Sequence, residues 1–167
     1  HFGKAYSVIT GIKSAKEKHV MFSDIDLATP IEEAERLMGE IDNGYQIIIG
    51  SRSSDRAGAP IMRKIMAFSA IVIRNMIIGL RGIKDTQCGF KLFEKKFALK
   101  IIDKLIVFHD KRKVEGSSVS AGFDMEFLFL ATRLGYKIKE TSVDWRHVET
   151  KHINFLKDAI ESFKDIL

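Results

Sequence analysis

The chain has 167 residues, a formal net charge of +5 and 46% hydrophobic residues, which suits one folded domain rather than a disordered segment. Its single cysteine, Cys88, excludes an intrachain disulfide and a cysteine-based zinc site. The basic residues are scattered without a nucleic-acid-binding motif, and no uncharged stretch is long enough to span a bilayer. We therefore expect a protein that is soluble or peripheral to a membrane and binds no nucleic acid.

The hydrophobic pattern predicts helices that alternate with short apolar strands. The expected helices cover residues 5–15, 30–41, 60–80, 94–105 and 123–134, and the expected strands cover residues 20–22, 45–49, 89–93 and 137–145. Residues 45–49 are apolar apart from Gln46, as in a strand buried on both faces of a sheet. Residues 137–145 alternate, as in an edge or antiparallel strand. This order favours a single α/β domain over residues 1–167 with a largely parallel sheet.

Two aspartates, Asp24 and Asp26, directly follow the first predicted strand. Residues just beyond the carboxyl end of a strand in a parallel sheet face the ligand crevice. Two carboxylates there suit a hard divalent cation that bridges a diphosphate, with phosphate and water completing the coordination shell. The pattern alone fits equally well a turn in which Asp26 caps a helix.

Further segments in the same order resemble the polyprenyl-phosphate branch of the inverting family 2 glycosyltransferases, and in particular the dolichyl-phosphate β-glucosyltransferases. The matching segments are FSDIDLATPIEE (22–33), IGSR (49–52), IKDTQCGFKLF (83–93), FDME (123–126), LGYKIKE (134–140) and VDW (143–145). The resemblance implies a GT-A fold, which is Rossmann-like. It implies transfer of glucose from UDP-glucose to a polyprenyl (dolichyl) monophosphate, with inversion at the anomeric carbon and assistance by Mg²⁺ or Mn²⁺.

Carried over by position, the resemblance assigns Asp24 and Asp26 to the metal, and Asp24 also to the donor diphosphate. Related mannose synthases have a glutamine two residues beyond the pair, where this chain has Ala28. Family members also begin with an apolar strand that supplies much of the nucleobase pocket, and this chain lacks such a run. We therefore expect an amino-terminally truncated GT-A domain. Lys4, in a segment similar to a Gly-Lys-Gly motif, is a candidate for offsetting diphosphate charge.

Four other residues are candidates for the reaction. Arg52 follows an apolar strand, and its planar fork suits two phosphate oxygens. Asp85 and Gln87 precede another strand, where Asp85 is a candidate catalytic residue and Gln87 a donor ligand, or where Asp85 only forms a turn. Asp124 is a candidate catalytic base by alignment with wider family 2 enzymes, although helix capping explains it equally simply. A phosphate acceptor is mostly ionised at neutral pH, so charge neutralisation should matter more than a base.

The predicted helix 60–80 bears on membrane contact. It is long and apolar, with Arg63 and Arg74 on one neighbouring stripe. Such a helix can lie in a bilayer interface with its cations toward the headgroups, where the arginines would also meet a lipid-linked phosphate. An ordinary core helix with two solvated arginines is the alternative. The resemblance places the enzyme at the cytoplasmic face of a membrane.

Two classes of function remain open on the sequence alone. The first is a hexosyltransferase acting on a polyprenyl phosphate, with glucose expected and mannose or another hexose as alternatives. The second is a non-catalytic, membrane-associated module without a complete nucleotide site. The missing opening strand favours the second class, whereas the acidic pair and the motif order favour the first.

Overall fold

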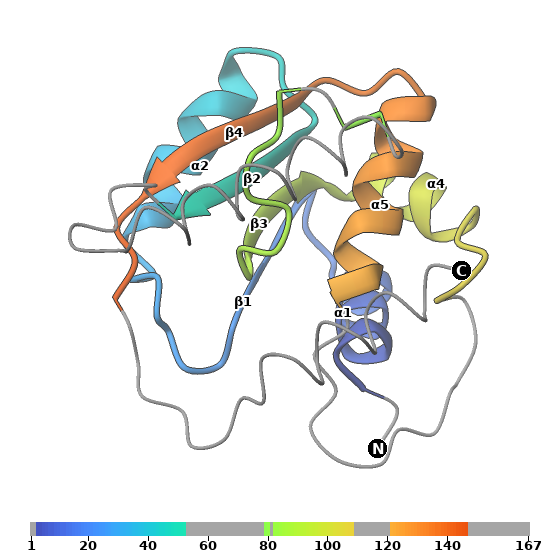
Figure 1. Cartoon of the computed structure of the whole chain (residues 1–167), viewed down its shortest axis with the longest axis horizontal. Helices are drawn as coiled ribbons and strands as arrows, with labels where there is room; N and C mark the ends of the chain where they lie inside the picture. Colours follow the sequence, from blue (N-terminus) through green and yellow to red (C-terminus); the bar gives the residue numbers. More distant parts are fainter. Residues whose placement is uncertain (1–2, 53–78, 81, 109–120, 147–167) are drawn as a thin grey trace, which may run out of the picture.

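The computed structural model describes residues 3–52, 79–80, 82–108 and 121–146. Every predicted element within these ranges is confirmed, with shifted ends (Figure 1). The elements are α1 (Gly3–Ser14), β1 (His19–Ser23), α2 (Glu33–Asp42), β2 (Ile47–Arg52), β3 (Phe90–Glu94), α4 (Lys95–Ile102), α5 (Ala121–Arg133) and β4 (Ile138–Val143). Pro30 precedes α2 rather than opening it, because the Glu33 amide donates to the Pro30 carbonyl in a tight turn.

The sheet has the order β1-β3-β2-β4, and the prediction of a largely parallel sheet is wrong for it. Among the described strands, only β2 and β4 pair in parallel, whereas β3 pairs antiparallel with both β1 and β2. The strand–helix–strand order predicts parallel neighbours, but β3 enters between β1 and β2 from the opposite end. Because β1, β2 and β4 still point the same way, their carboxyl ends share one end of the sheet. The strand predicted over 137–145 does lie at an edge of the described sheet.

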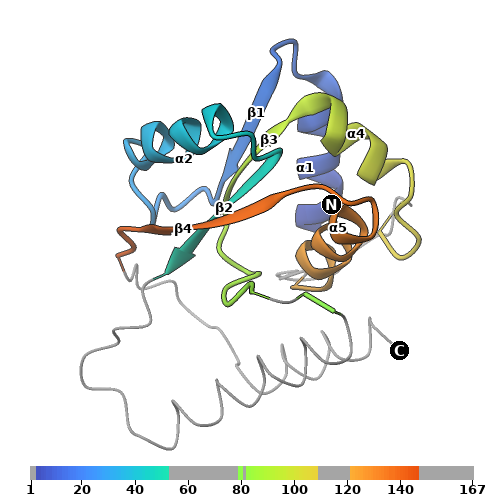
Figure 2. The same ribbon diagram turned by 90° about the horizontal axis from the view of Figure 1, so that it is seen from above.

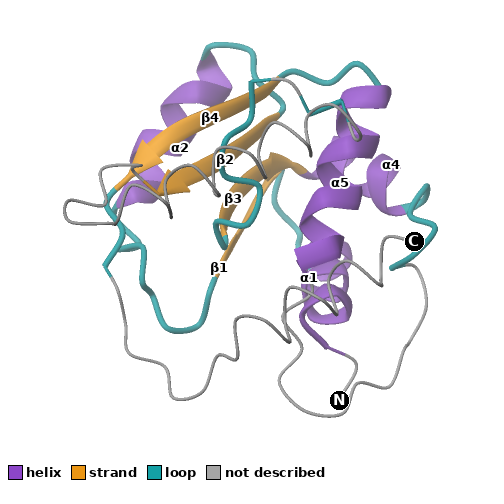
Figure 3. Cartoon of the chain, viewed as in Figure 1, coloured by secondary structure: helices purple, strands orange, loops and turns teal. Residues whose placement is uncertain are grey.

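Helices cover both faces of the sheet, which gives three layers (Figures 2 and 3). Alternate residues of β2 divide the core: Ile47 and Ile49 pack with α1, α4 and α5, whereas Ile48 packs with Leu37 of α2. All four side chains are fully buried. Burying each of them stabilises the fold by about 1.5–3 kcal/mol before entropy is counted. This packing fixes the carboxyl ends of β1, β2 and β4 relative to the helices on each face.

Candidate functional site

The loop after β1 places Asp24 against two other elements. The Asp24 amide donates to the Gly89 carbonyl at 2.8 Å, and the Asp24 carboxylate accepts from Lys4 Nζ of α1 at 2.7 Å. Gly89 is required here, since a Cβ at that position would lie 1.9 Å from Asp24 Oδ2. The structure therefore brings together Lys4 and Asp24, which the sequence predicted as donor-binding residues.

Asp26 lies on the same loop and is exposed. Its Oδ1 accepts the Ala28 amide at 3.1 Å, which closes a local turn through Leu27 at a φ of 50°. A positive φ is uncommon for leucine, and this turn stabilises it. Asp26 does not cap α2, whose N-cap residue is Glu32 and lacks a side-chain cap. Within the described residues no three histidine, cysteine or acidic side chains gather as metal ligands, so the metal site stays a prediction.

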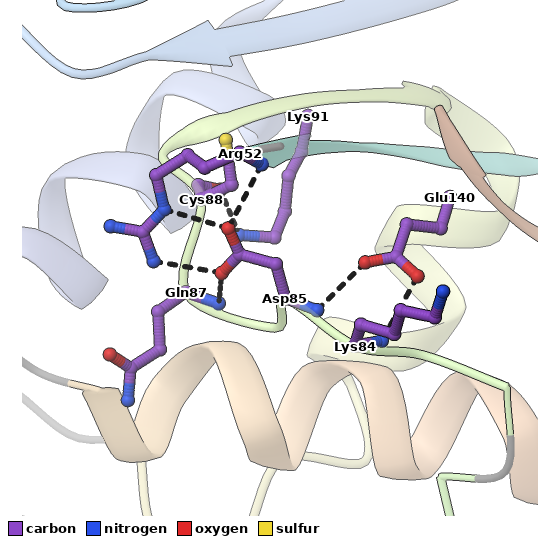
Figure 4. A network of polar contacts seen from close by, with 7 residues as sticks. All are labelled: Arg52, Lys84, Asp85, Gln87, Cys88, Lys91 and Glu140. Carbon is purple, nitrogen blue, oxygen red and sulfur yellow. Dashed lines mark hydrogen bonds and ion pairs between the residues drawn. The ribbon is translucent and has the colours of Figure 1, made fainter. Parts of the chain in front are cut away.

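Arg52 and Asp85 form a bidentate ion pair at the end of β2 (Figure 4). Arg52 Nε donates to Asp85 Oδ2 at 2.7 Å and Nη2 to Oδ1 at 2.8 Å, while the Arg52 amide adds a third bond at 3.1 Å. The side chain of Asp85 is 14% exposed and that of Arg52 is 31% exposed.

The pair shifts both ionisation equilibria toward the charged forms. Its hydrogen bond raises the pKa of Arg52 above the ordinary value. Burial works to raise the pKa of Asp85, but the hydrogen bonds and charge of Arg52 outweigh it, so this pKa lies below the ordinary value. Asp85 is thus ionised at neutral pH, and both of its carboxylate oxygens accept hydrogen bonds from Arg52.

The segment around Asp85 is held by the carboxylate of Glu140 on β4. Its Oε1 accepts the Asp85 amide at 2.7 Å, and its Oε2 accepts the Lys84 amide at 2.9 Å (Figure 4). Gln87 contributes its amide to Asp85 Oδ1 at 3.2 Å, while its side chain is directed away from that carboxylate. Asp85 and Gln87 therefore lie together, but the donor contact predicted for the Gln87 side chain stays a prediction.

A pocket connects the two charged groups at the ends of β1 and β2. It is lined by Ser23, Asp24, Ala28, Thr29, Arg52, Gly89 and Trp145. The guanidinium of Arg52 lies 5.8 Å from the centre of the Trp145 ring, and the Arg146 amide holds the Ala28 carbonyl at 2.8 Å. Trp145, which ends the matching segment at residues 143–145, is thus part of the pocket wall. Its position just beyond a strand end was the available signal.

Asp124 lies outside this pocket, on α5. Its side chain is 5% exposed and pairs at 2.7 Å with Lys91 Nζ, whose side chain is 1% exposed. Sequence reasoning missed Lys91, although a lysine between Phe90 and Leu92 in an apolar strand was a visible signal. The catalytic role of Asp124 remains a prediction.

Arg63, Arg74 and the predicted helix 60–80 lie outside the described residues. Among the helices that are described, none combines the length and apolar character that crossing a bilayer demands. The predicted membrane contact therefore stays a prediction.

The fold defines the class of protein. Glucosyl-3-phosphoglycerate synthase from Mycobacterium tuberculosis superposes with a TM-score of 0.62 at 13% identity, covering 98% of this chain and 53% of that one. The chain accordingly has a glycosyltransferase fold of the GT-A type. No family model matches the sequence.

Curated sequences give the particular relationship. The chain is 33% identical to the dolichyl-phosphate β-glucosyltransferase of Dictyostelium discoideum and 29% identical to that of Saccharomyces cerevisiae, each over 99% of its length. The human protein of the same name is 26% identical. The resemblance in the sequence motifs is confirmed: the chain is a relative of the dolichyl-phosphate β-glucosyltransferases. It spans about half the length of these curated relatives.

Proposed function

We propose that this protein transfers a hexose, with glucose as the first candidate, from a UDP-sugar to a polyprenyl (dolichyl) monophosphate with inversion. The observation that carries the proposal is the pocket in which Asp24 and Arg52 meet at the shared end of β1 and β2. Ligands of open α/β sheets bind at such carboxyl ends. The names of the relatives supply the sugar and the acceptor.

Charge neutralisation is the main chemical task in this reaction. The acceptor phosphate attacks the anomeric carbon through an oxygen that is already ionised, and UDP leaves from the opposite face. Arg52 and Lys4 offer cationic donors beside the pocket, each preoriented by a carboxylate at 2.7 Å. Donors fixed before the reaction stabilise a developing diphosphate charge without reorganising.

Asp85 fits a positioning role within this scheme. Its two oxygens hold the guanidinium of Arg52, and its amide is held in turn by Glu140. A carboxylate that is ionised and bidentate to arginine is poorly suited to accept a proton. We therefore propose that Asp85 orients Arg52 toward the donor phosphates.

Asp24 and Asp26 fit a divalent cation as a two-carboxylate set. Both belong to one loop, and their oxygens are the ligand type that Mg²⁺ and Mn²⁺ prefer. Asp24 Oδ1 accepts a hydrogen bond from the Lys4 ammonium at 2.7 Å, and its second carboxylate oxygen remains as a ligand atom for the metal. When bound, the metal would act as a Lewis acid on the diphosphate oxygens. Asp26 would keep one oxygen for the turn at Ala28.

Calorimetry with UDP-glucose and Mn²⁺ tests the proposal. We expect metal-dependent heat, followed by turnover of UDP-glucose in a donor panel with a short polyprenyl phosphate. A preference for another hexose would correct only the sugar, because sugar selection depends on fine pocket geometry. No metal-dependent heat would instead support the non-catalytic module.

We also propose peripheral contact with a membrane, at its cytoplasmic face, because the acceptor in the relatives' name is a lipid phosphate. Retention on anionic liposomes is the direct measurement. Full recovery in the unbound fraction would contradict this part of the proposal.

A further inference from the structure

A buried lysine lies directly behind the candidate site. Lys91 is the second residue of β3 and is 1% exposed. Its Nζ donates to Asp124 Oδ1 at 2.7 Å and to the Cys88 carbonyl at 2.6 Å. Lys91 therefore joins α5 to the turn that precedes β3.

That turn is the surface on which Asp24 rests. Gly89 follows Cys88 directly, accepts the Asp24 amide at 2.8 Å and leaves no room for a Cβ beside the Asp24 carboxylate. Any displacement of the Cys88 carbonyl is thus passed on to Asp24 through one residue. The contacts form a continuous chain from Asp124 to Asp24 on the loop after β1.

The ring of Phe22 provides a second connection. Phe22 is the direct cross-strand partner of Lys91, whose Nζ lies 5.2 Å from the ring centre. Lys4 Nζ, which pairs with Asp24, lies 5.7 Å from the same ring. Both ammonium groups therefore lie near the same Phe22 ring, at distances typical of cation–π contacts.

Stability alone does not require this ion pair. Desolvating two charges is costly, and replacing a buried pair by apolar side chains of similar volume is often neutral or stabilising. Removing one partner is different, because it leaves the other charge buried and unpaired. Apolar side chains in place of Lys91 and Asp124 could restore stability, but they could not donate a hydrogen bond to the Cys88 carbonyl and so could not hold the turn in place.

We propose that Lys91 and Asp124 are positioning residues that set Asp24 for the donor, by fixing the Cys88–Gly89 turn beneath it. This rests on the proposed donor-binding role of Asp24. In this proposal Asp124 holds Lys91, and Lys91 holds the Cys88–Gly89 turn on which Asp24 rests. Asp124 removes no proton from the acceptor.

The test compares Lys91→Met, Asp124→Leu and the double variant. Each single variant should lose thermal stability, and the double variant should recover it. In the double variant the Asp24 amide should still exchange its hydrogen about tenfold faster, which corresponds to one weakened backbone hydrogen bond. Its affinity for UDP with Mn²⁺ should fall by a similar factor. Lys96→Met, which removes the ion pair of an exposed lysine with Glu94, is the matched control and should change neither readout.

Wild-type exchange at Asp24 in the double variant would overturn the proposal. If that variant fails to fold, Asp124→Asn keeps the side-chain shape, and unchanged exchange there would count equally against it. A wild-type protein that binds no UDP would refute the proposed function instead. The exchange measurement would still decide the role of Lys91.

Discussion

Gly89→Ala is the substitution that most directly perturbs the candidate site. The added Cβ would lie 1.9 Å from Asp24 Oδ2 and 2.1 Å from its Cγ, whereas real contacts of this kind are not shorter than 3.0 Å. The Asp24 carboxylate must therefore move by about 1 Å or more to relieve the overlap. Such a movement must change the contact with the Lys4 ammonium, which now lies 2.7 Å from Asp24 Oδ1.

The magnitude differs between stability and function. The atoms in conflict belong to a side chain, so the fold can yield at a cost of about 1–3 kcal/mol, typical of overpacking. The ion pair with Lys4 adds little, since exposed pairs contribute about 0–1 kcal/mol. A displacement of about 1 Å at a reacting site can lower the rate about 100-fold. We therefore expect a folded protein with a large loss of turnover.

The assay measures metal-dependent UDP binding by calorimetry and glucose transfer to a short polyprenyl phosphate. Gly39→Ala is the matched control, because a Cβ there meets nothing within 4 Å. Alanine inside α2 should stabilise the helix by about 0.5–1 kcal/mol and leave transfer unchanged. Wild-type affinity and turnover in Gly89→Ala would refute the reasoning about Asp24.

Three other outcomes are expected. In a complete enzyme, Asp26→Ala should nearly abolish turnover, whereas Asp124→Asn should leave measurable activity; comparable losses would defeat this ranking of metal over base. Asp85→Asn should lower the free energy of unfolding at neutral pH by about 1–3 kcal/mol. Because the pKa of Asp85 is lowered in the folded state, that contribution is present above the ordinary aspartate pKa of about 3.9 and is lost as pH falls through the folded value. Denaturant titrations should show the difference from wild type shrinking below about pH 4, and a constant difference would contradict the ion pair. In liposome flotation, replacing Arg63 and Arg74 by glutamine should reduce retention on anionic vesicles, and unchanged retention would exclude the interfacial helix.

The predicted elements agree with the structure because their signals are local. Strand β2 begins with three isoleucines, and Ile47, Ile48 and Ile49 are all fully buried. The direction of β3 was not predictable in the same way. Its sequence fits either orientation, and only its partners β1 and β2 decide that it runs antiparallel to both.

The site was predicted in part for a similar reason. Asp24 and Arg52 each follow an apolar strand, which is a local signal for the crevice end of a sheet. The partner of Arg52 is 33 residues away in Asp85, and the partner of Lys91 is 33 residues away in Asp124. Such pairings depend on how separate elements pack. Residue types alone therefore could not decide whether Asp124 is a catalytic base or a helix-capping residue.

By itself, the sequence determined the class of fold, the apolar strands and the acidic loop at Asp24 and Asp26. Hydrophobic periodicity and strand-end chemistry are properties of neighbouring residues, so they can be recognised in the sequence without a structure. Only the tertiary structure decided that Asp85 orients against Arg52, that Trp145 joins the pocket and that Asp124 pairs with Lys91. The physical reason is that charge pairing and burial depend on distances through space, which packing of the helices against the sheet sets.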